Sequence, residues 1–115
     1  MNRVPVFLAD NELLRCPHCD GNYLHQGKVQ TFFRGEDEDQ TKVSLHSFDE
    51  DITTVMTNSL TLNPSYRRHG LRISFTCENC TSPEGDSWPD IGDLCIYQHK
   101  GQTFVEWDIN ENIIS

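Results

Sequence analysis

The chain has 115 residues, and its 18 acidic and nine basic side chains give a formal net charge of −9. This length predicts a single domain over residues 1–115, with residues 110–115 frayed. The negative charge argues against direct DNA binding and against docking on anionic membranes, and it favours a basic protein partner.

Hydrophobic residues make up only 36% of the chain, so we expect a small core that needs a disulfide or a metal to hold it. No stretch approaches the ~20 apolar residues of a membrane span. The first fifteen residues also lack the pattern of a secretory signal. These features predict a cytoplasmic protein, where cysteines stay reduced and are more often metal ligands than disulfides.

The elements predicted along the chain are short and mostly extended. Residues 4–8 favour a short strand or turn, and Asn11–Leu14 favours a short helical turn. Alternating and β-branched patterns then predict strands at residues 23–34, 43–48, 52–62, 71–76, 94–99 and 102–109, the last two forming a hairpin around Lys100-Gly101. The predicted fold class is therefore all-β or β-rich, built on a small antiparallel sheet.

Two aspects of this pattern predict burial. In the segment 52–62, Ile52, Met56, Leu60 and Leu62 share the even positions, which suits a half-buried strand, and its four threonines make a helix the weaker alternative. Trp107 alternates with Val105 and is expected in the core, whereas Tyr66 and Trp88 are candidates for exposed contact residues.

The strongest motif is a pair of C-x-x-C sequences, Cys16-Pro17-His18-Cys19 and Cys77-Glu78-Asn79-Cys80. Each spacing allows a tight turn, called a zinc knuckle, to aim two sulfurs at one point, and two knuckles fill a tetrahedral Zn²⁺ shell. The intervening segment is longer than in a compact ribbon, so we expect a β excursion inserted between the knuckles. A thioredoxin-like redox site and an iron–sulfur cluster are the alternatives.

Four cysteine ligands would leave no coordination position for water, so we expect one structural Zn²⁺ rather than a catalytic one. The fifth cysteine, Cys95, alternates with apolar residues and is expected to be a buried small side chain. His18 lies inside the first knuckle and is expected to be exposed at its tip. The remaining histidines suggest no second metal site.

Acidic residues occur in two blocks on either side of the predicted strand 43–48. If the blocks lie at one end of one hairpin, they form a single patch that could contact a basic partner. The predicted partner-binding residues are Glu36, Asp37, Glu38, Asp39, Asp49, Glu50 and Asp51.

A basic cluster, Arg67, Arg68, His69 and Arg72, interrupts this acidic composition. It could touch phosphates, but we expect it to pair with the acidic blocks or with a partner. The sequence contains no phosphate-binding loop, dinucleotide motif or nucleophile elbow. The acidic residues are adjacent rather than spaced to converge on one ion, so we do not expect an enzyme.

Three segments carry a resemblance to a known family: CPHCDGNYLHQGKVQTFFRGEDED, NPSYRRHGLRISFTCENC and YQHKGQTFVEW. Over residues 13–107 the chain resembles small zinc-ribbon proteins found in bacteriophage and prophage genomes. Among phage proteins of this size and charge, it is similar to zinc-containing anti-CRISPR proteins that inhibit type II-A Cas9.

The resemblance implies a stoichiometric inhibitor, acting in the cytoplasm of a bacterial host, that binds the Cas9–guide RNA complex and blocks loading or cleavage of target DNA. Cas9 holds its heteroduplex in a positively charged channel, which is compatible with an acidic partner. The alternative is a zinc-ribbon accessory or adaptor of the transcription or replication machinery that uses Arg67, Arg68 and Arg72 on nucleic acid. The chain could be a monomer or a homodimer that pairs through an edge strand.

Overall fold

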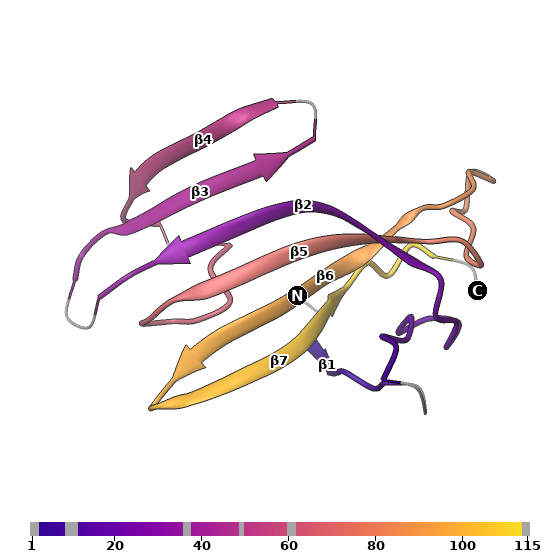
Figure 1. Ribbon diagram of the computed structural model, residues 1–115, viewed down its shortest axis with the longest axis horizontal. Coiled ribbons are helices and arrows are strands. Elements are labelled where there is room, and N and C mark those ends of the chain that lie inside the picture. Colours follow the sequence, from indigo (N-terminus) through magenta and orange to yellow (C-terminus); the bar gives the residue numbers. More distant parts are fainter. Residues whose placement is uncertain (1–2, 9–11, 36–37, 49, 60–61, 114–115) are drawn as a thin grey trace.

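The protein is a single antiparallel β-sheet of seven strands in a computed structural model that describes residues 3–8, 12–35, 38–48, 50–59 and 62–113 (Figure 1). The sheet order is β1-β7-β6-β5-β2-β3-β4. The strands are β1 (Arg3–Pro5), β2 (Leu24–Phe33), β3 (Thr41–Ser47), β4 (Glu50–Thr57), β5 (Gly70–Cys77), β6 (Asp90–His99) and β7 (Gln102–Ile109).

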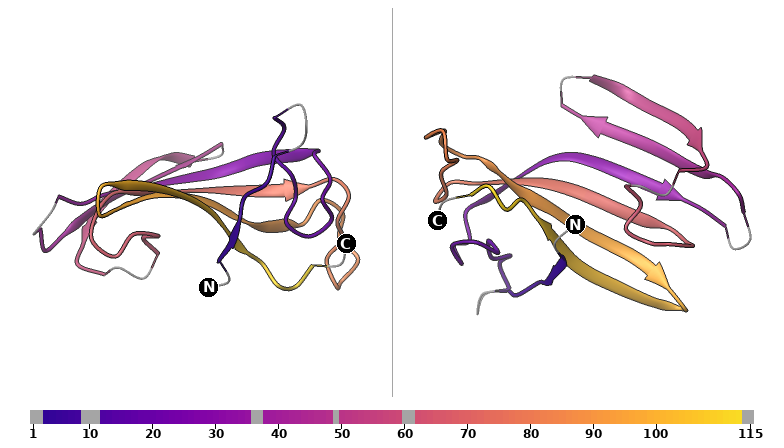
Figure 2. Two further views of the ribbon diagram at one scale, coloured as in Figure 1. Left: turned by 90° about the horizontal axis from the view of Figure 1, so that it is seen from below. Right: turned by 180° about the vertical axis from the view of Figure 1, so that it is seen from behind.

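The sheet forms one layer, which is visible when it is viewed edge on (Figure 2). The molecule measures 43 × 31 × 23 Å. Four strand pairs, β2–β3, β3–β4, β5–β6 and β6–β7, join neighbours in sequence. The β2–β5 pair joins segments that are distant in sequence. Because β3 and β4 follow β2 in the sheet order, the β3–β4 hairpin forms one end of the sheet.

The two faces of the sheet differ in what covers them. Directly opposed residues of antiparallel strands share a face, so Phe75, Leu94 and Trp107 lie on one face and Arg72 and Asp108 on the other. The first, which we call the knuckle face, packs at one end against the cysteine-bearing segments. The second, which we call the loop face, carries residues 62–69, where the Ser65 hydroxyl donates to the Gln98 carbonyl.

The core is small and lies at the knuckle end of the sheet. Its buried members are Cys16, Cys77, Cys80, Ile91 and Trp107. Half-buried Leu14, Leu24, Phe75, Leu94 and Ile109 pack around them. Since three of the five buried members are cysteines, any ion held by these cysteines lies inside the hydrophobic core.

A buried ion pair ties the loop face together. The Arg72 guanidinium lies 3.1 Å from an Asp93 carboxylate oxygen on β6 and 2.9 Å from one of Asp108 on β7. Its Nε donates to the Leu62 carbonyl. This single side chain therefore links three strands to the segment that crosses them.

The predicted all-β class is confirmed, and the β2, β3, β5 and β7 segments were predicted to within two residues at each end. The β6 strand begins at Asp90, four residues before its predicted start. The predicted helical turn at Asn11–Leu14 is wrong for its described part, because Leu14 instead forms an antiparallel bridge with Leu8. Asn11 itself lies outside the described residues. Within the described part of the chain, no helix is long and apolar enough to cross a membrane.

The predicted half-burial of segment 52–62 is also wrong. Ile52 and Met56 do share one face of β4, but they are 65% and 58% exposed. Leu62 is exposed as well, and Leu60 lies outside the described residues. Alternation reports that two side chains share a face, and it does not report whether anything covers that face.

Candidate metal centre

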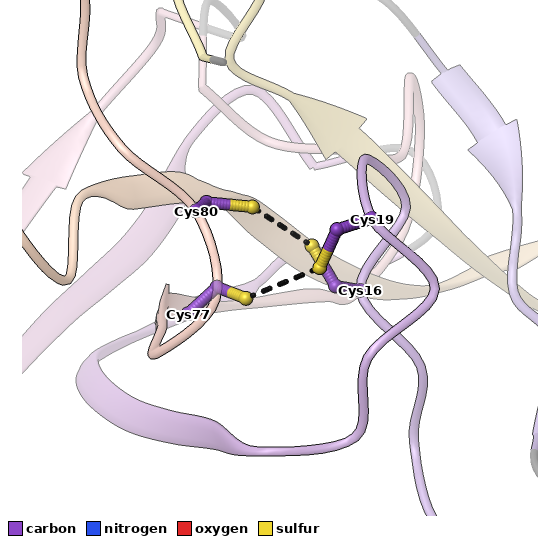
Figure 3. Close-up of side chains that lie close together, drawn as sticks. All are labelled: Cys16, Cys19, Cys77 and Cys80. Carbon is purple, nitrogen blue, oxygen red and sulfur yellow. Dashed lines mark hydrogen bonds between the residues drawn. The ribbon is translucent and has the colours of Figure 1, made fainter. Parts of the chain in front are cut away.

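The four knuckle cysteines converge on one point, as Figure 3 shows. Their sulfur atoms all lie within 4.8 Å of one another, with Cys16 and Cys80 at 3.7 Å and Cys19 and Cys77 at 3.6 Å. Tetrahedral Zn–S bonds of about 2.3 Å require sulfur separations of about 3.8 Å. A disulfide would require about 2.05 Å, so all four are free thiols at the spacing of a structural zinc site.

Backbone N–H groups point at the sulfurs in both knuckles. The His18 N–H donates to the Cys16 sulfur and the Gly21 N–H to the Cys19 sulfur, each at 3.4 Å. The Asn79 N–H donates to the Cys77 sulfur at the same distance. Two residues between cysteines produce this turn, and its N–H dipoles stabilise the thiolates that Zn²⁺ requires.

The sheet brings the two knuckles together. Cys77 ends β5 and pairs with Leu24, the first residue of β2, which begins five residues after Cys19. The Glu78 N–H also donates to the Tyr23 carbonyl. The inserted strands therefore leave from one knuckle and return directly to the other, as the sequence predicted.

Gly21 of the first knuckle segment lies against Asn79 of the second knuckle. A Cβ at this position would lie 2.6 Å from the Asn79 side-chain nitrogen and 3.3 Å from the Cys19 sulfur. The Gly21 carbonyl also accepts from the Cys16 N–H at 2.7 Å. The absence of a side chain therefore allows the two cysteine turns to approach one another.

Burial opposes ionisation of these thiols when no cation is present. It raises the pKa of Cys16 to about 11 and raises the pKa of Cys80 above its ordinary value. Although burial also acts on Cys19, hydrogen bonds from the Gly21 N–H and from neighbouring thiols lower its pKa. A divalent cation supplies the compensating charge, so the donor set fits one Zn²⁺ and would release protons on binding it.

His18 is not a fifth ligand. Its Nε2 lies 3.1 Å from the Ile91 carbonyl oxygen, which ties the first knuckle to β6. The expectation that it is exposed is wrong, because this hydrogen bond holds the ring in a half-buried position. Cys95 is fully buried on the loop face, as predicted, and Trp107 is buried in the core.

One contact beside the second knuckle was missed by sequence reasoning. The ring of His25, on β2, stacks on Trp88 with a centroid separation of 4.5 Å. His25 Nε2 also lies 2.6 Å from a Glu78 carboxylate oxygen. Trp88 is 49% exposed, as its polar surroundings predicted. The stacking was not predicted because His25 and Trp88 are 63 positions apart, and no pattern of neighbouring residues indicates a contact over that distance.

The acidic blocks do not form the single patch that was expected. Glu38 and Asp39 precede β3, whereas Glu50 and Asp51 follow it, so they lie at opposite ends of that strand. A strand of this length separates its ends by roughly 20 Å. Glu36, Asp37 and Asp49 lie outside the described residues.

The basic cluster is also divided by the fold. Arg72 is 2% exposed and faces Asp93 and Asp108, so its pairing is with strand residues rather than with the acidic blocks. Arg67 is exposed in the segment that crosses the loop face. The Nδ1 of His69 accepts from the Arg34 N–H at 2.9 Å.

Comparison with protein-family models, with curated proteins and with solved structures finds no match to this chain.

Proposed function

We propose that this protein is a zinc-stapled binding module that acts by stoichiometric contact with a basic partner protein. The observation that carries the proposal is the set of four converging cysteine thiols inside the core. Four thiolates saturate a tetrahedral ion, so the metal holds the fold and leaves no open position for substrate. The function then resides on the surface of the sheet.

The surface charge favours a basic partner. With a net charge of −9, the chain would be steered toward a positive surface. Glu38, Asp39, Glu50 and Asp51 are all exposed and have no described ion pair, so they are available for such contacts. Proteins that handle nucleic acids carry positive grooves of the required kind.

The finer proposal is that the partner is a type II-A Cas9–guide RNA complex, and it rests on the sequence resemblance alone. The test measures target-DNA binding by that complex with and without equimolar zinc-loaded protein. Loss of DNA binding supports inhibition at loading, and retained binding with lost cleavage supports inhibition at the nuclease step. Unchanged binding and cleavage would contradict the proposal for the Cas9 tested.

Separate charge reversals can locate the contact, because the two acidic pairs lie at opposite ends of β3. Glu38→Lys with Asp39→Lys tests one end, and Glu50→Lys with Asp51→Lys tests the other. Glu84→Lys with Asp86→Lys is the matched control, since it makes the same charge change in the exposed loop after the second knuckle. We expect one strand-end variant to lose potency at least tenfold. Equal potency of all three would contradict an acidic contact surface at β3.

A second candidate, a nucleic-acid accessory, is favoured by one observation. Tyr66, which is 80% exposed, lies beside Tyr97 and Phe104 around a hollow of about 410 Å³, with Arg67 next in sequence. Exposed rings beside cations can stack single-stranded bases. Oligonucleotide anisotropy with Tyr66→Ala tests this role, and Tyr23→Ala, another exposed tyrosine, is the control. Absence of salt-dependent binding would exclude the accessory role.

A further inference from the structure

Strand β4 is an open edge of the sheet. Among the described strands it contacts only β3, so its outward backbone groups have no strand partner. Folded proteins protect such edges with lysine, proline or very short strands. The opposite edge strand, β1, has three residues and contains Pro5. By contrast, β4 has eight residues, EDITTVMT, with neither lysine nor proline.

Strand β4 exposes apolar side chains on both faces of the sheet. Ile52 and Met56 point to the knuckle face, and Val55, which is 51% exposed, points to the loop face. A long edge that combines open hydrogen-bonding groups with exposed β-branched and apolar side chains is a template for another strand.

We propose that β4 pairs antiparallel with β4 of a second copy of this chain, in the register that places Thr54 at the two-fold axis. Ile52 then opposes Met56 of the partner subunit, and Thr53 opposes Val55 of the partner subunit. Each of these pairs shares one face, so apolar side chains meet apolar or β-branched ones on both sides of the sheet.

Hydroxyl groups continue this pairing at the axis. The Ser44 and Thr54 side-chain oxygens lie 3.0 Å apart on the knuckle face. Thr54 opposite Thr54 of the partner subunit extends that contact into a row of four hydroxyls across the interface. Cross-strand threonine pairs of this kind stabilise sheets.

Charge selects this register over its neighbour. Centring on Thr54 places Glu50 and Asp51 at the far end of β4 from the same residues of the partner subunit, near the end where that subunit carries Lys42. Centring on Thr53 instead would place Asp51 opposite Val55 of the partner subunit and desolvate a carboxylate against an apolar side chain. The sequence of β4 is therefore more self-complementary in the register centred on Thr54 than in the register centred on Thr53.

The predicted dimer is a continuous sheet of fourteen strands with no long open edge. Symmetric pairing of one edge with itself closes after two copies, because each copy uses its only long edge. One strand pair makes a small interface, so we expect a dissociation constant on the order of micromolar. The zinc end and the loop-face hollow remain open for other partners.

Sedimentation equilibrium of the zinc-loaded full chain between about 1 and 200 µM tests the proposal. We expect the mass to rise from 13.3 kDa toward twice that value. Thr54→Lys and Thr54→Glu each place like charges directly opposite one another at the axis, so each is expected to raise the dissociation constant at least tenfold. Gln102→Lys, on the exposed start of β7, is the charge-matched control and is expected to dimerise normally.

Mixing the two Thr54 variants distinguishes the interface from a folding defect. A lysine on one subunit opposite a glutamate on the other is attractive at the axis, so the mixture is expected to form a heterodimer at concentrations where each variant alone is mostly monomeric. A monomeric wild-type protein throughout the range would overturn the proposal. Dimers that tolerate both Thr54 variants, or a mixture that stays monomeric, would equally overturn it.

Discussion

Arg72 is the buried cation on which the loop face depends. Its side chain is 3% exposed, and the two carboxylates it contacts belong to different strands. The carboxylate of Asp108, which is 13% exposed, has limited access to water once that contact is lost. Removing one partner of a buried ion pair costs more than the pair contributes, because the remaining charge stays desolvated.

We therefore expect Arg72→Met to lower the free energy of unfolding by about 3 kcal/mol while zinc binding at the other face is retained. Urea denaturation measures the loss, and a thiol-displacement assay counts the zinc. Arg67→Met, at an exposed arginine five positions earlier, should change stability by less than about 0.5 kcal/mol. Equal effects of the two substitutions would contradict a structural role for the buried pair.

Cys95 makes the stability depend on pH in the alkaline range. Burial raises its pKa from 9.0 to about 11, so the folded state keeps a proton that the unfolded state loses. The contribution of Cys95 to the free energy of unfolding is fully present below pH 9. It is lost as the pH rises toward 11, by about 3 kcal/mol at most. Cys95→Ala should remove this slope. If the unfolding midpoints of the wild type and the variant change equally with pH between 8.5 and 10.5, the proposed role of Cys95 is contradicted.

Among the elements, the β6–β7 hairpin is the most locally determined part of the sheet. Its turn places Lys100 at φ 50° and Gly101 at φ 78°. Two successive positive φ values are typical of the type I′ turn, which matches the right-handed twist of the flanking strands. Alternation on both sides agrees with this turn, and β6 and β7 form the predicted hairpin, with His99 paired to Gln102.

Substitutions at this turn should act in opposite directions. Gly101→Ala is expected to destabilise the protein by about 1 kcal/mol through backbone strain alone, because a Cβ there meets no atom within 4 Å. Lys100→Asn is expected to stabilise it by about 0.5 kcal/mol, since asparagine adopts positive φ more readily. Thermal melting measures both, and equal signs would contradict the turn type.

The β3–β4 hairpin is the element least supported by the rest of the molecule. It contacts the sheet through β2 alone among the described strands, and both faces of β4 are exposed. The acidic pairs lie at the two ends of β3, so they do not meet within the hairpin. The position of the hairpin at one end of the sheet makes β4 the edge that a second copy can extend.

Across the molecule as a whole, stability is concentrated at the zinc end. A single-layer sheet buries little apolar surface, and three of the five fully buried core members are metal-ligand cysteines. The metal's binding free energy, on the order of 10 kcal/mol, therefore becomes folding free energy. The hydrophobic core and the metal centre are one structure rather than two.

Metal removal should consequently unfold the chain. We expect one Zn²⁺ per chain, and we expect chelation or Cys16→Ser or Cys77→Ser to leave it largely unfolded. In a Trp88→Phe background, the emission of buried Trp107 should shift to the red as its contact with Phe75 is lost. Cys95→Ser, at a cysteine outside the site, is the control and should keep its zinc. A normal melting curve for either ligand variant would contradict a structural role for the metal.

Interactions between near neighbours in the sequence set the local features of this protein. C-x-x-C spacing sets the knuckle turns, alternation sets the strands, and Lys100-Gly101 sets one hairpin, because each depends on residues only a few positions apart. The four ligands and the all-β class were predictable for that reason.

Which strands meet, and what covers them, became known only from the tertiary structure. The pairing of β2 with β5 carries the β3–β4 hairpin away from the core, which leaves Ile52 and Met56 exposed. The same sheet order places Arg72 between two aspartates instead of on the surface. These outcomes depend on contacts between residues distant in sequence, and no local pattern records them.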